Sequence, residues 1–264
     1  MLLDRETLMT HLIEDDEKII AAKALDKVES VLKGTELAYT DFLDPHQQSI
    51  VEGIVRQIPD IKYRFEGGYR RAERKRLLII PEYMLWEFTD EPLTYLELTG
   101  NFNFQRVSHR DYLGSLMGLG LRREMLGDIL VFKEGGCHLI VADEIADTIK
   151  MRLDKVHQVP VDIKEIEKED LKLPEEKTKE ISTTVPSLRL DSVASSGFST
   201  SRSKMAKEIK HEKVKVNFKV EDNPAAMIDP EDIISIRGRG RVEIKSINGE
   251  TRKGRLKLTL CRYY

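Results

Sequence analysis

Residues 188–220 read LRLDSVASSGFSTSRSKMAKEIKHEKVKVNFKV, and their order of apolar, small and basic residues sets the fold of the C-terminal part of the chain. The pattern predicts a short helix over 187–198 and a strand over 213–220. Between them, Ser201 is a good N-cap for a second helix that runs to about Lys210. Two short helices and a strand are therefore expected to open this part of the chain.

The second of these helices has one apolar face and one basic face. The apolar face consists of Met205, Ala206 and Ile209. The opposite face, at spacings of three and four, consists of Lys204, Lys207 and His211. A solvated surface would explain these charges, but Arg202 lies in the first turn, where the helix dipole disfavours a cation and free backbone N–H groups suit a phosphate. Arg202 therefore indicates an anion-binding site.

Three further strands are expected over 232–237, 241–247 and 254–262, with Asn248-Gly249 as the hairpin turn between the last two. Their alternation separates an apolar side from a mainly basic side. The segment Arg237-Gly238-Arg239-Gly240-Arg241 places three guanidinium groups between glycines, so that its backbone can approach a phosphate chain closely. Arg252-Lys253-Gly254-Arg255 repeats this chemistry in the next turn. The alternative is that both basic turns serve solubility.

Charge is distributed unevenly along the 264 residues. Overall, 43 Lys and Arg oppose 46 Asp and Glu, which gives a net charge of −3. Residues 182–264 nevertheless carry 17 basic and 10 acidic residues, so the preceding part is strongly acidic. An asymmetry of this kind indicates a basic module that binds a polyanion.

Several classes of protein are not expected. No apolar run reaches the length of about 20 residues that crosses a bilayer, and the start MLLDRE lacks the cationic and apolar regions of a signal peptide. Cys137 and Cys261 lie far apart without a Cys-x-x-Cys motif, so neither a disulfide framework nor a metal site is expected. Both thiols are expected in strands, buried or half-buried, in a reducing cytoplasm.

The acidic part predicts two domains. Residues 1–60 read as helical and are followed by strands over 61–65 and 77–80. Residues 92–166 predict the order strand, helix, strand, strand, helix, strand, which is the ferredoxin-like βαββαβ arrangement. The RNA-recognition motif shares this order, but the third strand here, GCHLIV at 136–141, has no aromatic ring on which a base could stack. The topology alone therefore implies no RNA binding.

A charged segment separates the acidic part from the basic part. Residues 161–180 contain 13 charged residues and no glycine, and Pro174 blocks a long helix. A solvated linker over 167–181 is expected, with a helical spacer as the alternative. The predicted α+β chain thus has a mainly helical domain over 1–75, a ferredoxin-like domain over 76–166, this linker, and a basic domain over 182–264.

Residues 188–220 resemble the S4 domain, a widespread RNA-binding module. The shared pattern consists of Arg189-Leu190-Asp191, Ser201-Arg202 and Val214-Lys215-Val216-Asn217. Glu212 and Phe218 stand where the S4 pattern has glycine, although an aromatic residue after Asn217 is in keeping with the YlmH-like branch. The loss of glycine at 212 puts the geometry of the helix end in question.

The chain outside the linker is similar to the YlmH-like S4-domain proteins of bacteria and plastids. The matching stretches are TDFLDP at 40–45, FEGGYRRAER at 65–74, SHRDYLGSLMGLGLRREMLGDI at 108–129, and IRGRGR and TRKGR within 236–255. The resemblance implies that the basic domain is an S4-type RNA-binding domain. It also implies that the ferredoxin-like domain is a further candidate for RNA binding.

This resemblance implies a non-catalytic RNA-binding factor of the ribosome. The implied partners are rRNA, tRNA and the large ribosomal subunit that carries an obstructed peptidyl-tRNA, in ribosome-associated quality control. A cytoplasmic bacterial monomer without cofactor, metal or membrane contact is expected. Two alternatives stay open. One is an adaptor for cell division, which the family's gene neighbourhood suggests; the other is an RNA-modifying enzyme, because S4 modules also accompany pseudouridine synthases.

Two groups of residues are expected to contact RNA. The group in the S4-like domain consists of Arg189, Ser201, Arg202, Lys204, Lys207, Lys215, Asn217, Arg237, Arg239, Arg241, Arg252, Lys253 and Arg255. The candidates for a second contact with RNA or the ribosome are Tyr69, Arg70, Arg71, Arg74, His109, Arg110, Arg122 and Arg123. A solvated helix around residue 70, and helix capping and packing over 109–120, are the alternatives for this second group.

No catalytic residue is expected. His109-Arg110-Asp111 matches the catalytic-loop triplet of protein kinases, but the glycine-rich loop, the Val-Ala-x-Lys strand and the Asp-Phe-Gly motif are missing from the sequence.

Overall fold

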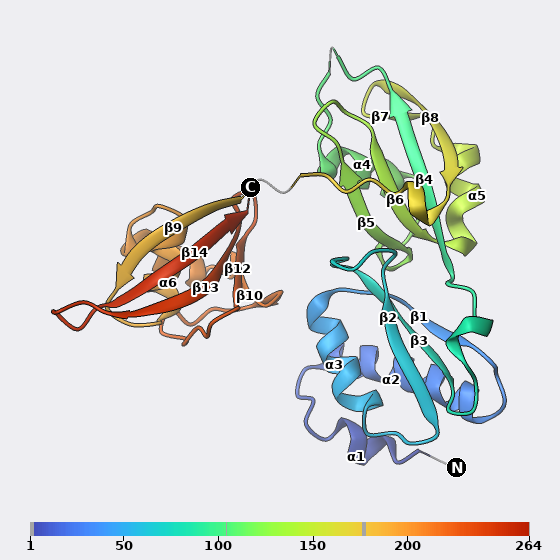
Figure 1. Ribbon diagram of the computed structural model, residues 1–264, viewed down its shortest axis with the longest axis horizontal. Coiled ribbons are helices and arrows are strands. Elements are labelled where there is room, and N and C mark those ends of the chain that lie inside the picture. The colour runs from blue at the N-terminus through green and yellow to red at the C-terminus, as the bar shows by residue number, and fades with distance from the viewer. Residues whose placement is uncertain (1–2, 104, 176–177, 264) are drawn as a thin grey trace. The chain divides into compact units, whose positions relative to one another are not determined.

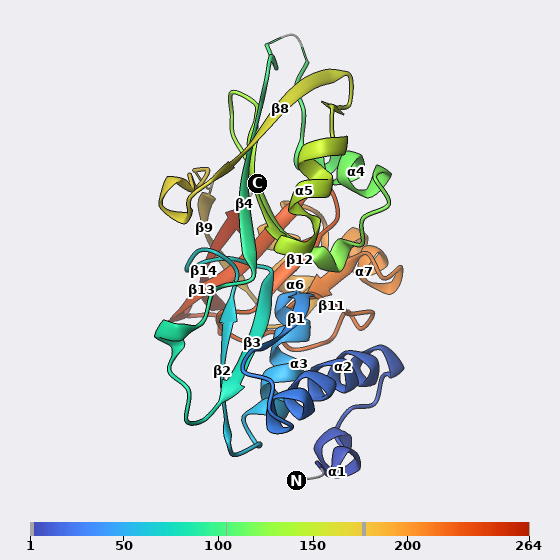
Figure 2. The same ribbon diagram turned by 90° about the vertical axis from the view of Figure 1, so that its right-hand side faces the viewer.

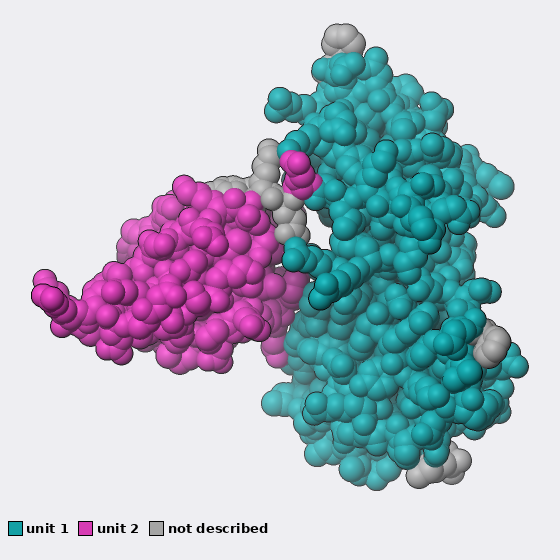
Figure 3. Space-filling view, in the orientation of Figure 1, with its two compact units in different colours: residues 1–174 teal, residues 175–264 magenta. Residues whose placement is uncertain are grey.

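The computed structural model describes residues 3–103, 105–175 and 178–263 (Figure 1). They form two compact units, 1–174 and 175–264, which Figure 3 colours separately. Helices and strands occur in both units, which confirms the α+β class. The division falls within the predicted linker, of which residues 176 and 177 lie outside the described part. Among the described residues, none of the helices combines the length and apolar character that a membrane crossing requires.

The first unit begins with helices packed on a three-stranded antiparallel sheet of order β1-β3-β2. The helices are α1 (Arg5–Met9), α2 (Asp15–Leu32) and α3 (Pro45–Val55), and the strands are β1 (Ala38–Leu43), β2 (Ile61–Glu66) and β3 (Lys75–Pro81). The prediction that 1–60 is helical missed β1. Its side chains alternate in burial and it pairs with β3, more than thirty residues later, so local periodicity gave no sign of its partner.

The rest of the first unit has the expected ferredoxin-like order. Its sheet, of order β5-β6-β4-β8-β7, consists of β4 (Leu93–Gly100), β5 (Leu126–Val131), β6 (Cys137–Ala142), β7 (Lys155–Val156) and β8 (Val159–Ile166). Helices α4 (His109–Gly118) and α5 (Asp143–Arg152) pack on one face (Figure 2). Ser108 caps α4 in a reciprocal capping box with Asp111, as its position predicts.

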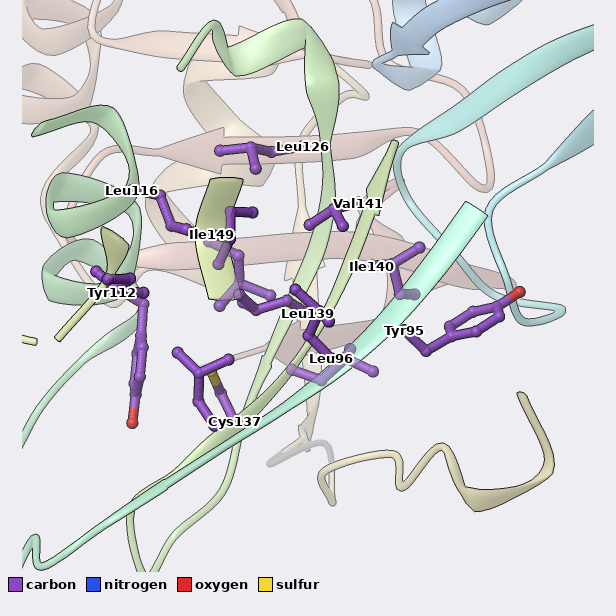
Figure 4. Packing of buried hydrophobic residues seen from close by; sticks show 14 of the residues in the cluster. Tyr95, Leu96, Tyr112, Leu116, Leu126, Cys137, Leu139, Ile140, Val141 and Ile149 are labelled. Carbon is purple, nitrogen blue, oxygen red and sulfur yellow. The ribbon is translucent and has the colours of Figure 1, made fainter. Parts of the chain in front are cut away.

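The face of this sheet opposite the two helices is covered by the segments around Gly68 and Lys172. Figure 4 shows Leu116 and Ile149 of the two helices gathered on one side, while Ile140 and Tyr95 point away from them. On that second side Gly68 packs so closely that a Cβ atom would come within 2.6 Å of the Tyr95 ring. Nearby, His138 Nδ1 accepts the backbone N–H of Lys172 at 3.1 Å. The sheet surface on which an RNA-recognition motif stacks bases is therefore occupied.

Asp128 joins the two halves of the first unit. It lies within the register irregularity of β5 between Leu126 and Ile129. Its carboxylate accepts the Tyr69 hydroxyl at 2.8 Å and the backbone N–H groups of Glu73 and Arg74 at 2.8 and 3.1 Å. Arg74 in turn donates to the carbonyl oxygens of Phe42 and Leu126, at 2.9 and 3.0 Å. These bonds fix the 67–74 loop of the first half on β5 of the second.

The second unit is a six-stranded antiparallel sheet of order β11-β10-β12-β13-β14-β9 with two helices packed on it. Its elements are β9 (Thr178–Val185), α6 (Leu190–Gly197), α7 (Arg202–Lys210), β10 (Val214–Val216), β11 (Lys219–Val220), β12 (Ile233–Ile236), β13 (Gly240–Glu250) and β14 (Leu256–Tyr263). Gly197 lets α6 approach the sheet, because a Cβ atom there would lie 2.6 Å from Val242 Cγ1. Cys137 and Cys261 are buried in β6 and β14, as expected.

Two turns of this unit differ from their predicted positions. The strand predicted over 213–220 is a hairpin, because Asn217 and Phe218 adopt positive φ angles of 48° and 70° and reverse the chain. Asn248 and Gly249 lie within β13 at a register irregularity, and the reversal between β13 and β14 occurs over 251–254 instead. In both cases pairing with neighbouring strands overrides the local pattern.

The end of α7 keeps the geometry of a glycine-terminated helix without glycine. Glu212 has φ 58°, the Glu212 N–H donates to Ile209 at 2.9 Å, and the Lys213 N–H donates to Glu208 at 3.2 Å. These two bonds are those of a Schellman motif. Glu212 and Phe218, the two positions where the S4 pattern has glycine, are thus both in the left-handed region.

We expect Asp128→Ala to lower the free energy of unfolding of the first unit by about 2–4 kcal/mol, because it leaves the hydroxyl and two N–H groups without their acceptor. Urea denaturation measures the change. Asp147→Ala, at a side chain that is 79% exposed, is the control and should shift stability by less than about 0.5 kcal/mol. Equal effects of the two variants would contradict the role of Asp128.

Candidate nucleic-acid interface

A basic groove lies in the second unit, where the β12–β13 turn meets the β10–β11 hairpin and the end of α7. Its volume is about 960 Å³. The cations that line it are Lys213, Lys215, Arg237, Arg239 and Arg241. The acidic residues that line it are Glu208 and Glu212, so positive charge dominates. Three of the five cations come from the glycine-containing turn singled out in the sequence.

The two glycines of the β12–β13 turn are required by its backbone. Gly238 and Gly240 have φ angles of 79° and 84°, a region that residues with a Cβ atom seldom adopt. Between them the Arg239 N–H closes the turn on the carbonyl of Ile236 at 2.9 Å. This alternation of glycine with arginine presents three guanidinium groups within five residues.

Neighbouring side chains orient two of these guanidinium groups. Arg239 Nη2 lies 2.8 Å from a carboxylate oxygen of Glu208, on α7. The guanidinium carbon of Arg241 lies 5.3 Å from the centroid of the Phe218 ring, within the range of a cation–π interaction. Arg237 and Lys215 are exposed. Lys213 and Phe218 also line this site, although the sequence did not predict them. Phe218 reaches it through the unpredicted β10–β11 hairpin.

Asn217 acts within this site by shaping the hairpin. Its side-chain amide donates to Asp232 at 2.7 Å, and its side-chain oxygen accepts the Ile233 N–H at 3.0 Å. These bonds hold a left-handed residue next to Phe218. Asn217 therefore positions the groove.

A second cluster joins the starts of the two helices. Asp191 of α6, with a side chain only 7% exposed, lies 3.1 Å from Arg189 and 2.9 Å from Arg202. Burial alone would raise the pKa of Asp191, but the hydrogen bonds from both arginines outweigh it and the pKa is lowered. Asp191 thus offsets the cation in the first turn of α7, while both guanidinium groups stay partly exposed.

Ser201, Lys204 and Lys207 lie on α7 as predicted. The Ser201 hydroxyl caps the helix by accepting the Lys204 N–H at 3.3 Å. Lys204 and Lys207 are exposed, whereas Met205 and Ile209 are fully buried on the apolar face.

The second basic turn lies far from the first. Gly240 and Glu250 are the two ends of β13, and eleven residues of strand span roughly 35 Å. The Arg237–Arg241 turn is at one end and the 251–255 turn, at the tip of the long hairpin in Figure 1, is at the other. Arg255 is also tied to Thr184 of β9, donating to its carbonyl and its hydroxyl. The two turns do not form one surface.

The residues proposed for a second contact are partly enclosed and partly exposed. Tyr69 and Arg74 belong to the junction around Asp128, and Arg123 donates to the Leu126 carbonyl at 2.6 Å. Burial lowers the pKa of Arg74, and it lowers that of Arg123 to about 10, as expected of enclosed structural cations. The residues that remain exposed are Arg70, Arg71, His109, Arg110 and Arg122. Residues 70–74 form turns and bends, so the alternative of a solvated helix is wrong.

Among the residues that the structure describes, no cluster of three or more His, Cys, Asp or Glu side chains could hold a metal ion. The chemistry of the two cationic clusters is that of anion binding by oriented guanidinium and ammonium groups.

The helices, sheet and basic groove of the second unit define the class: an S4-type RNA-binding domain, matched by the S4 domain model over residues 188–234. Two further models match the first unit, "YlmH, N-terminal" over 16–84 and "Putative RNA-binding domain in YlmH" over 87–170. The chain is also 38% identical over 247 residues to the ribosome-associated protein quality control protein P2 of Bacillus subtilis (strain 168), with 94% of this chain and 95% of that protein covered. This chain belongs to the YlmH family.

A solved structure, the cell division protein ylmH from Streptococcus pneumoniae, shares the fold. It covers 61% of this chain and 97% of its own, with a TM-score of 0.51 and 23% sequence identity.

We expect Asp191→Asn to destabilise the second unit by about 1–3 kcal/mol at pH 7, because its charge-assisted bonds to Arg189 and Arg202 are lost. The pKa of Asp191 is lower in the folded state, so this stabilisation is present above the unfolded value of about 3.9 and disappears as the pH falls through the folded value. Urea denaturation at a series of pH values should show wild type and variant converging in acid. A difference that persists unchanged below pH 3 would contradict this account.

Proposed function

We propose that this protein is a non-catalytic RNA-binding factor of the ribosome that binds rRNA and tRNA through its S4 domain. The observation that carries the proposal is the groove in which five cations surround a glycine-containing turn and face only two carboxylates. Crowded like charges are stabilised when a polyanion neutralises them. Phosphate groups along an RNA backbone supply that charge at regular spacing.

Within this proposal the β12–β13 groove is the principal contact, and Arg189 and Arg202 at the helix starts add a further contact. Oriented guanidinium groups suit bidentate contacts to phosphate. Arg252 and Lys253, at the far end of β13, would reach a separate segment of the same RNA. Such a distribution suits a large, folded RNA better than a short strand.

The family supports a more specific partner. A relative of 38% identity is named as a ribosome-associated quality control protein. We therefore propose the large ribosomal subunit carrying an obstructed peptidyl-tRNA as the binding partner, with the S4 domain contacting both rRNA and tRNA. The protein would act in the cytoplasm as a monomer and contribute binding without catalysis.

We expect replacement of Arg237, Arg239 and Arg241 by Ala to weaken rRNA and tRNA binding and to reduce its dependence on salt. The log–log slope should become shallower by about 0.7 for each phosphate group of a single strand that the variant no longer neutralises. Fluorescence anisotropy with labelled tRNA over a series of salt concentrations measures both quantities.

The matched control replaces Lys18, Lys23 and Lys27 of α2 by Ala, which removes the same charge from the first unit. Its affinity and slope should equal those of wild type. Binding by the unsubstituted protein that does not respond to salt would rule out the proposed phosphate contacts.

A further inference from the structure

The first unit contains a second basic groove, on the helical side of its ferredoxin-like sheet. It lies between α4 and the hairpin of β7 and β8 and has a volume of about 450 Å³. Its lining includes Arg110, Gly114, Gly118, Arg152, Lys155 and His157. The opposite face of the sheet is covered by Gly68 and the Lys172 segment, whereas this groove is a concave basic surface that stays open.

Three cations from different elements converge on the groove. Arg110 comes from α4, Arg152 ends α5, and Lys155 begins β7. All three are exposed, and within the described ranges none of their side chains has a hydrogen bond or an ion pair, although Arg110 interacts electrostatically with Asp111. By contrast Lys150, two residues before Arg152, is paired with Asp147 and Glu165 at 2.9 and 2.7 Å. The groove thus gathers three exposed cations, one more than the carboxylates that line it.

The acidic residues of the groove balance these cations only in part, because two carboxylates, Asp111 and Asp154, lie among three cations. The carboxylate of Asp111 caps α4 by accepting the N–H and the hydroxyl of Ser108 at 2.8 and 2.7 Å, and it stays charged near Arg110. Asp154 is the other carboxylate in the lining.

Helix α4, which forms one wall of the groove, has glycine at two positions, 114 and 118, where packing does not require it. Gly114 and Gly118 follow Arg110 at intervals of four, so the three share one face of α4. A Cβ atom at either glycine would meet nothing within 4 Å. Gly114 lies inside α4, where glycine costs about 1 kcal/mol relative to alanine, whereas Gly118 is the last residue of the helix. No neighbouring atom of the described chain requires glycine at either position. The bare backbone there does allow a phosphate to approach the helix closely.

The opposite wall holds His157 in a left-handed conformation. Its φ is 57°, which is unfavourable for a residue with a Cβ atom. The hydrogen bond to Gln105 holds its ring at the groove. The two-residue turn between β7 and β8 requires this conformation, because Val156 pairs directly with Val159.

We propose that the groove between α4 and the β7–β8 hairpin binds the phosphodiester backbone of RNA, as a second contact separate from the S4 domain. This inference rests on the proposed function, since it assigns a second site for the same RNA ligand. The cations supply the attraction, and the glycine face gives the backbone room beside the helix.

The test uses the full-length protein and a fluorescein-labelled RNA hairpin with single-stranded flanks, followed by anisotropy over a series of salt concentrations. We expect Arg152→Glu combined with Lys155→Glu to weaken binding by about tenfold or more. The log–log slope should fall by about 1.4, because two phosphate groups are no longer neutralised. The matched control, Lys23→Glu with Lys27→Glu on α2, changes the charge equally and should leave affinity within about twofold.

Repeating the measurement in the Arg237, Arg239 and Arg241 to Ala background separates the two proposals. A further loss of affinity from the groove substitutions supports two sites. Complete loss of binding from the S4 substitutions, with no effect of the groove substitutions in either background, would overturn this inference and leave the proposed function intact. Absence of any RNA binding by wild type would overturn both proposals. An equal loss of affinity in the α2 control would overturn this inference, because the loss would then follow from the change in net charge alone.

A second variant excludes misfolding as the cause. Gly114→Ala combined with Gly118→Ala should raise the melting temperature, because alanine favours the helix. The same variant should weaken binding to the hairpin by about fivefold, because two methyl groups occupy the path of the backbone. A variant that is more stable and binds equally well would count against a close approach of RNA to α4.

Discussion

Mutual repulsion among cations is the constraint on which the second unit depends. Five basic side chains meet around one turn, and the fold tolerates them because single partners hold selected groups in place. Glu208 holds Arg239, the Phe218 ring lies beside Arg241, and Asp191 holds Arg189 and Arg202 at the helix starts. The remaining cations face solvent, so the surface is oriented in advance while most of its charge stays available to a polyanion.

Left-handed backbone conformations give this surface its shape. Gly238 and Gly240 supply two of them in the β12–β13 turn. Glu212 and Phe218 supply two more without glycine, held by the Schellman bonds of α7 and by the amide of Asn217. Phenylalanine at position 218 also makes a contact that glycine could not make, because its ring lies beside Arg241. Departures from the S4 pattern thus preserve its geometry and add a contact.

The sequence predicted those features that depend on local order. The Ser201 cap, the buried Met205 and Ile209, and the ferredoxin-like order over 92–166 all follow from spacing, and the structure has them. It did not predict β1, the β10–β11 hairpin or the junction at Asp128, because their partners are distant in sequence. Arg74 and Arg123 show the same limit: a basic motif indicates charge, but only the fold shows that these cations are enclosed structural groups.

The most direct measurement is sedimentation of the full-length protein with ribosomes in a sucrose gradient. The account predicts that the protein travels with free large subunits, especially those retaining peptidyl-tRNA, and that substitution of Arg237, Arg239 and Arg241 by Ala returns it to the top of the gradient. Recovery with septal proteins in place of ribosomes, or an unchanged profile for the variant, would contradict the claim that the S4 groove binds ribosomal RNA.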